Sequence, residues 1–384
     1  MKRGLAMVVL AVGLLAAVAA WVGSTGTGGE GGAVAASGSK RGGCGVLVRS
    51  LAALSSAVES AGEGGVVCLA DGSYGDLELG EGGEAAARVT VRAAHPGRAA
   101  VAEAEIGRSR LTLARFVIGD GVSVEPGTVG VTVAHNRIAG GYLGIDAGPT
   151  TTTTVNDVAI VGNKFVGPFG EDAIRLNRYH DANGDGVGAL VANNEFTNIR
   201  ENGNHSDCLQ TVWVGDHLVY RGNYLHDNRC QGFFVKDQRR PVKGILIEDN
   251  LIVRNSAPCA PGAEGCGAPS DLQVFGPYSG LTMRRNTIWG NGAIAAFQEA
   301  DGARARIEAN VVYKFWTSTD LSAARFRDNT RCQRQSSGGG TWPEPVGEVV
   351  SCAPRFLAPG RDDYRVRGGG RGVTWAPGER HFGP

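Results

Sequence analysis

Short runs in which apolar and polar residues alternate recur along most of the chain. Clear examples are residues 131–133, 158–160 and 245–247. Strict alternation predicts β-strands that bury one face. Patterns typical of long amphipathic helices are nearly missing, and the one expected helix is a short element at residues 50–60, before the first strands. The chain is therefore expected to be all-β.

A three-residue motif follows these runs and recurs along the chain. It consists of an asparagine, any residue and an apolar residue. Successive copies lie 24 to 36 residues apart. Asparagine tolerates the left-handed conformation of a turn, and its amide can hydrogen-bond the next asparagine in a stack. This repeat predicts a solenoid of stacked rungs. The copies start at Asn136, Asn163, Asn194, Asn223, Asn250, Asn286 and Asn310.

A further strand in each rung carries the candidate chemistry. Its copies are residues 173–177, 208–212, 232–236 and 270–275. The two long repeat intervals indicate inserted loops at residues 177–187 and 256–269. Insertions in solenoids often fall on the binding face. Alternation turns one set of side chains outward, where aromatic rings, amides and two cations suit a sugar chain; an ordinary solvated face is the alternative. One outward column is Arg175, Gln210, Phe234 and Gln273, and the next is Asn177, Val212, Lys236 and Phe275.

The repeated strands and asparagines resemble the pectate-lyase-like superfamily of right-handed β-helices, over roughly residues 66–316. The segment from 356 to 366 resembles the tail that closes these coils. The resemblance implies an all-β, single-stranded right-handed parallel β-helix over residues 44–330, with a short N-terminal capping helix and a loop-rich C-terminal cap at 331–384. This fold hosts lyases, hydrolases, epimerases and inert adhesins, so it does not choose an activity.

The start of the chain has the pattern of an export signal. Lys2 and Arg3 precede an apolar run that ends at Val22, so residues 1–22 are expected to be a signal peptide and residues 23–43 a flexible Gly/Ala-rich linker. An uncleaved membrane anchor is the alternative, because the run is long enough to cross a bilayer. A secreted monomer is expected. With 38 basic and 38 acidic residues, the chain lacks the charge of a nucleic-acid-binding protein.

The eight cysteines also favour an oxidising compartment. Their number is even and they show no zinc-ligand spacing, but eight cysteines allow many connectivities. Proximity in the sequence is the only guide to their pairing at this stage. The pairs expected from it are Cys44–Cys68, Cys208–Cys230, Cys259–Cys266 and Cys332–Cys352.

Two aspartates, Asp172 and Asp207, come just before two copies of the outward-facing strand. If the rungs align, they stack about 4.8 Å apart. Two ionised carboxylates this close need a cation, a shared proton or basic neighbours. We expect Ca²⁺ between them, because calcium prefers oxygen ligands. The acid pair of a hydrolase and two turn-capping aspartates are the alternatives.

A second calcium candidate is the loop that contains Asp181, Asn183 and Asp185. Its spacing matches the first half of a calcium loop. An EF-hand is excluded, because the position of its closing glutamate is occupied by Ala192. The alternative is a plain turn in which these side chains bind their own backbone.

The resemblance implies a reaction as well as a fold. Polysaccharide lyases remove the proton next to a uronate carboxylate and expel the linked sugar, and several on this fold use a lysine base beside calcium. By this resemblance Lys236 is the expected base, Arg175 the carboxylate clamp, and Asp237 a metal or orienting group with the aspartate pair. His205 is a further acid or base candidate, with simple hydrogen bonding as the alternative.

The expected partner is an extracellular polysaccharide bound by Gln210, Phe234, Gln273 and Phe275, and the expected activity is β-elimination of a uronate-containing glycan. The signature strings of well-studied pectate lyases and polygalacturonase-type hydrolases are missing from the chain. Two alternatives therefore stay open. One is a non-catalytic protein that binds glycans or decorates the cell envelope, and the other is a glycoside hydrolase.

Overall fold

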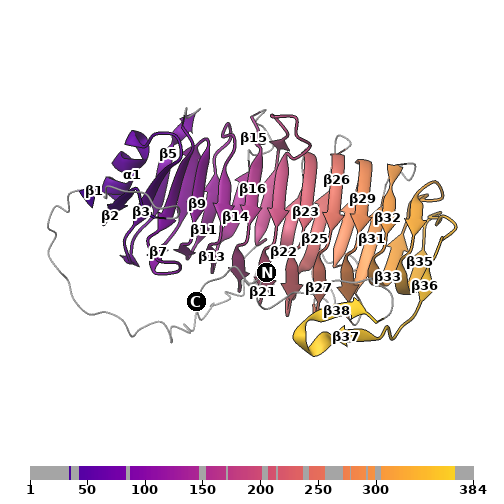
Figure 1. Ribbon diagram of the computed structural model, residues 1–384. Coiled ribbons are helices and arrows are strands. Elements are labelled where there is room, and N and C mark those ends of the chain that lie inside the picture. The colour runs from indigo at the N-terminus through magenta and orange to yellow at the C-terminus, as the bar shows by residue number, and fades with distance from the viewer. Residues whose placement is uncertain are drawn as a thin grey trace, which may run out of the picture. The chain divides into compact units, whose positions relative to one another are not determined.

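A coil of short parallel strands forms the body of the protein (Figure 1). The computed structural model divides the chain into two units, residues 1–31 and 32–384, and the coil lies in the second. The coil is a single-stranded right-handed parallel β-helix, as the family resemblance implied. The structure describes residues 34–35, 43–83, 87–146, 153–169, 172–200, 206–212, 215–236, 242–255, 271–276, 278–290, 293–298 and 304–367.

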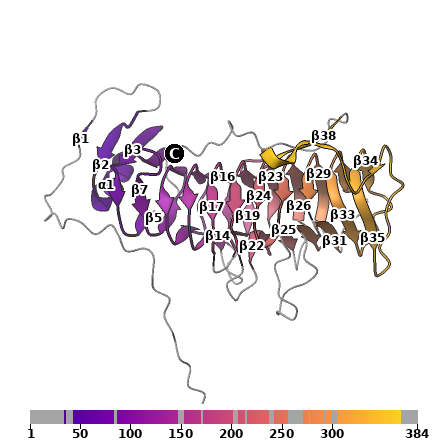
Figure 2. The ribbon, with the colours of Figure 1, turned by 90° about the horizontal axis from the view of Figure 1, so that it is seen from below.

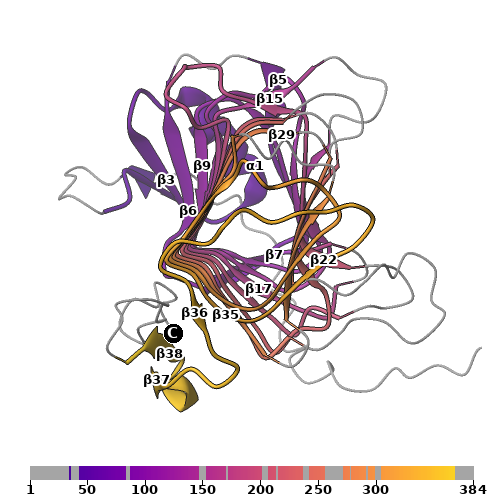
Figure 3. The same cartoon turned by 90° about the vertical axis from the view of Figure 1, so that its right-hand side faces the viewer.

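Three ladders of strands form the walls of the coil, which are seen end on in Figure 3. Ladder A is β1 (Val34–Ala35), β2 (Val46–Val48), β3 (Gly65–Leu69), β6 (Val89–Ala93), β9 (Leu111–Ala114), β12 (Thr132–Ala134), β16 (Val158–Val161), β20 (Ala189–Ala192), β23 (Asp216–Arg221), β26 (Val242–Glu248), β29 (Tyr278–Arg284), β32 (Arg306–Glu308) and β34 (Arg325–Arg327). Its pairings are parallel except between β1 and β2.

Ladders B and C stand side by side and are joined at the C-terminal end by longer strands. Ladder B is β4 (Gly72–Ser73), β7 (Ala99–Val101), β10 (Val117–Ile118), β13 (Arg137–Ile138), β17 (Lys164–Val166), β21 (Glu195–Thr197), β24 (Tyr224–His226), β27 (Leu251–Val253) and β30 (Thr287–Trp289). Ladder C is β5 (Leu77–Gly83), β8 (Ala104–Arg108), β11 (Gly121–Val124), β14 (Tyr142–Asp146), β18 (Ile174–Asn177), β22 (Asp207–Thr211), β25 (Gln231–Lys236), β28 (Leu272–Phe275) and β31 (Ile294–Gln298). The joining strands are β33 (Val311–Thr317) and β35 (Thr330–Ser336). The short β36 (Val349–Val350) pairs with the ladder B end of β35.

Aliphatic and aromatic side chains from all three ladders meet inside the coil and form one continuous core. The inward positions expected in ladder C, such as Ile174, Leu209 and Phe233, are fully buried. Like residues stack from rung to rung, and the rings of Phe165 and Phe196 lie parallel with centroids 4.8 Å apart. A stack of this kind buries each rung against its neighbours, which no rung achieves alone.

The expected helix is present as α1 (Leu51–Ser60) and caps the first rungs. It begins where the Ser50 side chain accepts a hydrogen bond from the Ala53 N–H, as an N-cap residue does. Leu54 and Val58 lie one turn apart, are buried, and belong to the same core as the strands. The helix therefore covers apolar side chains that the first rungs would otherwise expose.

The predicted asparagine ladder is present and buried. In each step the side-chain N–H of one asparagine and its backbone N–H both donate to the side-chain oxygen of the next, as from Asn194 to Asn223 at 3.0 Å. The turn conformation was assigned to the wrong residue, because the left-handed position precedes each asparagine. His135 and Asn193, for example, have φ of 56° and 55°. The ladder asparagines themselves are not among the residues with positive φ.

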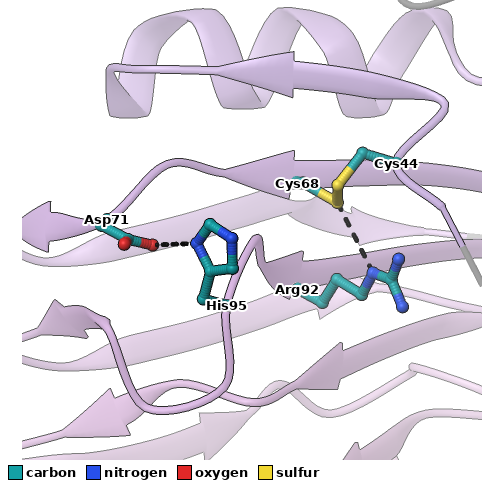
Figure 4. The surroundings of a disulfide bond; sticks show 5 residues. All are labelled: Cys44, Cys68, Asp71, Arg92 and His95. Atoms are coloured by element: carbon teal, nitrogen blue, oxygen red, sulfur yellow. Dashed lines mark hydrogen bonds and ion pairs between the residues drawn. A yellow bond between two sulfur atoms is a disulfide. The ribbon is translucent and has the colours of Figure 1, made fainter.

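Three of the four expected disulfides are present: Cys44–Cys68, Cys208–Cys230 and Cys332–Cys352. Figure 4 shows the first of them, which ties the segment before β2 to β3, with the Arg92 guanidinium 3.5 Å from the Cys68 sulfur. Cys259 and Cys266 lie outside the described residues, as does the expected signal peptide. In the described part of the chain, no helix has the length and apolar character needed to cross a bilayer.

The C-terminal hairpin folds back along the last rungs of the coil, as Figure 2 shows for β38 (Asp363–Val366). This strand pairs in an antiparallel hairpin with β37 (Phe356–Ala358), and a short 3-10 helix, η2 (Pro359–Arg361), connects them. Tyr364 packs in a small apolar cluster with Tyr224, Leu251 and Val253. The described part of the cap therefore covers apolar side chains of ladder B.

Two short strands, β15 (Val155–Asn156) and β19 (Tyr179–His180), form a separate parallel pair at the side of the coil. They flank the loop at residues 181–187, which runs from β19 to β20. The predicted insertion in this part of the repeat is therefore present. The second predicted insertion, at residues 256–269, lies outside the described residues.

Candidate functional site

The outward column expected on ladder C is present. The register pairs Arg175 of β18 with Gln210 of β22, Gln210 with Phe234 of β25, and Phe234 with Gln273 of β28. All four side chains are half-buried, so each exposes part of its surface. Guanidinium, amide and aromatic groups thus form a row across four successive rungs. A row of this kind can hydrogen-bond and stack on successive units of a polymer.

The same column continues beyond the strands that the sequence singled out. Ser123 and Gly144 lie in the rungs before Arg175, and Ala296 and Trp316 lie in the rungs after Gln273. The sequence carried a signal for the earlier part, because β14 alternates in the same way as β18. The column is therefore longer than predicted. A hollow beside Ser123 and Gly144, in its N-terminal part, was not predicted from the sequence.

Lys236 lies in the neighbouring column, opposite Phe275. Its Nζ is 4.7 Å from the centre of the Phe275 ring, which is the geometry of a cation–π contact. Asn177, expected in the same column, is buried, and its side-chain oxygen accepts a hydrogen bond from the Val212 N–H at 3.1 Å. This column therefore offers Lys236 and Phe275 to a ligand, while Asn177 connects two rungs.

The two aspartates predicted to form a pair, Asp172 and Asp207, lie next to each other at the start of two ladder C strands. Asp172 and Asp207 are both buried, and the Asp207 N–H donates to Asp172 Oδ1 at 2.9 Å. The other oxygen of Asp172 accepts from Nε and Nη2 of Arg175 at 3.2 and 3.1 Å. Gln210 Nε2 donates to Asp207 Oδ2 at 2.9 Å. The two carboxyls and the first two members of the outward column thus form one network.

Burial, and after it the charge of Asp207, raises the pKa of Asp172 to about 6. The Asp207 N–H and the Arg175 guanidinium act in the opposite direction and favour the ionised form. The network therefore holds a carboxyl that changes charge in mildly acidic solution. Arg175 supplies the positive charge that such a pair needs.

This arrangement does not fit a calcium ion between the two aspartates. Both oxygens of Asp172 already accept hydrogen bonds, and the Arg175 guanidinium already supplies a positive charge to Asp172. Within the described ranges, no group of three or more His, Cys, Asp or Glu side chains is arranged to hold a metal. Asp237, the third expected ligand, lies outside these ranges. No step of the chemistry below is therefore assigned to calcium.

The second calcium candidate, the loop at residues 181–187, is held together by its own backbone. Asp181 Oδ1 accepts from the Gly184 N–H at 2.8 Å, and its Oδ2 lies 2.7 Å from Nδ1 of His217. Asn183 and Asp185 each accept the N–H of the residue two positions later. The loop follows the ladder C strand, whereas Asp172 precedes it, so the two candidates do not form one site.

The Cys208–Cys230 disulfide lies directly beside this network. Cys208 follows Asp207 in β22, and Cys230 precedes Gln231, which the register places opposite Asp207. The bond therefore ties two adjacent rungs at the point where the carboxyl pair lies. Of the other expected site residues, His205 lies outside the described residues, as Asp237 does.

The structure does not bring the two expected catalytic cations together. Lys236 lies two rungs from Arg175 and two positions further along its strand. At about 4.8 Å per rung and 3.3 Å per residue, their Cα atoms are roughly 12 Å apart. Arg175 is directed toward Asp172 and the Tyr142 ring, and Lys236 toward Phe275. The two side chains thus point away from each other along the coil.

A second cluster of charged groups, on ladder B, was not expected from the sequence. Glu195 accepts from Lys164 Nζ at 2.9 Å and faces Nε2 of His226 at 3.2 Å, and Nδ1 of His226 faces Asp227 at 2.6 Å. Arg254 donates hydrogen bonds both to Asp227 and to Asp362 of the C-terminal cap. Burial raises the pKa of Glu195, but these hydrogen bonds outweigh it and lower the pKa. The cluster anchors the cap to the coil.

No protein-family model matches the chain, and no curated protein matches it significantly. Among solved structures, the catalytic unit of a GH87 α-1,3-glucanase from Streptomyces thermodiastaticus is similar, with a TM-score of 0.52 and 16% identity over 83% of this chain and 72% of that one. An alginate lyase from Paenibacillus has a TM-score of 0.43 and 14% identity, over 79% and 98% of the two chains. A mannuronan C-5 epimerase A-module from Azotobacter vinelandii has a TM-score of 0.43, 14% identity and coverages of 79% and 96%. The first likeness confirms the right-handed β-helix fold.

Proposed function

We propose that the protein is secreted and acts on an extracellular, uronate-containing polysaccharide, which it binds along ladder C and cleaves by β-elimination. The observation that carries the proposal is the outward column from Arg175 to Gln273, which runs unbroken across four rungs. Its groups are those that bind sugars: a guanidinium for a carboxylate, amides for hydroxyls and a ring for a sugar face. The disulfides agree with an oxidising, extracellular location.

In the proposed reaction a base removes the proton next to the uronate carboxylate. The bond to the linked sugar oxygen then breaks, a carbon–carbon double bond forms, and the leaving oxygen takes up a proton. Arg175 is proposed to bind the carboxylate and Lys236 to remove the proton. Because the two side chains point apart in the free protein, substrate binding must draw at least one of them toward the sugar. Catalytic contacts that tighten only with substrate are common in enzymes.

A panel of alginate, pectate and glycosaminoglycans tests the reaction. Cleavage by elimination leaves unsaturated ends that absorb in the ultraviolet, and we expect this signal with at least one uronate polymer. Lys236→Ala should remove turnover and retain binding. Lys243→Ala is the matched control, because Lys243 is an exposed lysine of β26 in ladder A. Silence across the panel for the unaltered protein would rule out elimination.

One observation favours a second candidate, a non-catalytic protein that binds the same glycans. Arg175 and Lys236 each have a partner on the protein, and neither points toward the other. In that case polymers bind without new ends of any kind, and Lys236→Ala leaves the protein's behaviour nearly unchanged. Reducing ends without ultraviolet absorption would instead identify a glycoside hydrolase.

A further inference from the structure

A shallow hollow of about 150 Å³ lies on ladder C, one rung before Arg175. Its lining includes Tyr142, Gly144 and Glu125. Tyr142 is 38% exposed, which is unusual for a large aromatic residue on this coil. The hollow borders the outward column, because Gly144 lies directly opposite Arg175 in the register.

The Tyr142 ring is held flat against the coil. A Cβ atom at position 144 would lie only 2.4 Å from Cε2 of the ring, so the ring occupies the space that any side chain there would need. The Arg175 guanidinium lies 5.4 Å from the ring centre. The ring is thus fixed between a glycine and a cation from the next rung. A fixed, exposed ring can stack on the C–H face of a sugar at little cost in conformational entropy.

The charge of the outward face changes sign at this hollow. In the column that contains Arg175, Gly144 and Ser123 come next toward the N-terminus and line the hollow. The two positions beyond them are Glu105 and Glu78, both exposed. Glu125, in the lining, shares a hydrogen bond with Glu105, and this contact, ahead of burial, raises the pKa of Glu105. A carboxylated sugar in the hollow would therefore meet like charge, whereas one at Arg175 would meet opposite charge.

We infer that the Tyr142 hollow binds a sugar without a carboxylate, next to a uronate at Arg175, so that the glycan is a heteropolymer that alternates uronate with uncharged sugar. The two positions are one rung, about 5 Å, apart, which suits neighbouring units of one chain. A polymer of uronate alone would have to place a carboxylate beside Glu125. This inference rests on the proposed function, since it concerns the same face.

Binding of the full chain to two polymers tests the inference by calorimetry. Hyaluronan alternates a uronate with an uncharged amino-sugar derivative, and pectate is built of uronate. At equal chain length and ionic strength we expect hyaluronan to bind about ten-fold more tightly. Tyr142→Ala should weaken hyaluronan binding about three- to ten-fold and leave pectate binding unchanged. Leu357→Ala, a similarly exposed residue of the C-terminal cap, is the control and should change neither.

Two further variants separate a binding role of the hollow from a structural one. Gly144→Ala should displace the ring and weaken hyaluronan binding as Tyr142→Ala does. Glu125→Gln removes a negative charge and should strengthen pectate binding while hyaluronan binding stays within two-fold. Melting curves of each variant show whether it is folded.

The possible failures are distinct. If pectate binds as tightly as hyaluronan and Tyr142→Ala changes neither affinity, the inference is wrong and the proposed function stands. If no polymer of the panel binds, the proposed function is wrong and the inference with it.

Discussion

Arg175 connects the buried carboxyl pair to the outer face of the coil. Its guanidinium donates two hydrogen bonds to Asp172 and also lies over the Tyr142 ring. The side chain is 25% exposed, whereas Asp172 is almost fully buried. A substrate carboxylate that binds here must share the guanidinium with Asp172. Arg175 is therefore important for stability as well as for binding, and the two roles can be separated.

Arg175→Ala is expected to lower the free energy of unfolding by about 2 kcal/mol, because it leaves the buried Asp172 without its counter-charge. It should also weaken polysaccharide binding. Adding Asp172→Asn to this variant removes the uncompensated carboxylate and should restore most of the stability, but not the binding. Chemical denaturation and calorimetry measure the two effects. Recovery of binding in the double variant would contradict a direct contact between Arg175 and the glycan.

The raised pKa of Asp172 has a consequence for stability. Its folded pKa, about 6, exceeds the ordinary value of 3.8 that applies to the unfolded chain. Between these values the unfolded state binds fewer protons than the folded state, so the free energy of unfolding falls as the pH rises from about 4 to 6. The contribution of this group is full below pH 4, is lost through pH 6 and does not change further above it.

Asp172→Asn should remove this part of the pH dependence. As the pH rises from 4 to 7, the free energy of unfolding of the variant should increase by on the order of 2 kcal/mol relative to that of the unaltered protein. Denaturation midpoints across this range measure the difference, and other titrating groups cancel in the comparison. Asp185→Asn, at an exposed position in the loop after β19, is the control. Parallel stability curves for Asp172→Asn and the unaltered protein would show that Asp172 does not titrate in this range.

Among the elements, the asparagine ladder defines each rung. Asn223, in the middle, donates to the Val191 carbonyl and to Asn250, and its oxygen accepts both N–H groups of Asn194. Asn329 was not predicted as a member, because Arg331 stands where the repeat has an apolar residue. It is the last acceptor and donates only to the Ile307 carbonyl among the described contacts. Interior steps therefore support more hydrogen bonds than the terminal one.

Asn223→Ala should lower the free energy of unfolding by about 3 kcal/mol, because it leaves the buried groups of Asn194 and Val191 without partners. Asn329→Ala should cost about half as much or less, since fewer groups depend on it. Thermal and denaturant unfolding of the two variants give the comparison. Equal losses would indicate that the ladder contributes by packing alone.

The strands could be predicted from the sequence because each rung repeats the same pattern of apolar residues and asparagine. Alternation identified the inward residues of ladder C, and the asparagines identified the rungs, so the pairing of Arg175 with Gln210 followed from simple alignment. The direction of the Arg175 side chain could not be predicted in this way. Its rotamer depends on the buried Asp172 and on the Tyr142 ring, which only the packed rungs bring near. The hydrogen bonds that both oxygens of Asp172 accept could not be predicted for the same reason.

At the scale of the whole molecule, three disulfides tie the coil within the described residues. The disulfide Cys44–Cys68 lies in the first rungs, Cys208–Cys230 beside the candidate site, and Cys332–Cys352 in the last rungs. The middle bond joins residues 22 positions apart. Closing a loop of this length restricts the unfolded chain and is worth roughly 3 kcal/mol. The bond also fixes the rungs that carry Asp207 and Gln231.

Replacing Cys208 and Cys230 together by serine should therefore lower the free energy of unfolding by roughly 3 kcal/mol. It should also weaken glycan binding more than the loss of Cys332–Cys352 does, because only the middle bond adjoins the Arg175 network. Denaturation and calorimetry on the two double variants provide the comparison. Equal effects on binding would show that the middle bond has no special relation to the site.

The central claim is that the outer face of ladder C is the glycan-binding surface. A crystal structure of the protein with a bound uronate-containing oligosaccharide tests this most directly. We expect the sugar chain to lie along the axis of the coil, with one carboxylate at Arg175, the adjacent unit over Tyr142 and, two rungs away on the other side, a unit over Phe234. An oligosaccharide bound on ladder A or ladder B, with the Arg175 column free of sugar, would contradict the claim.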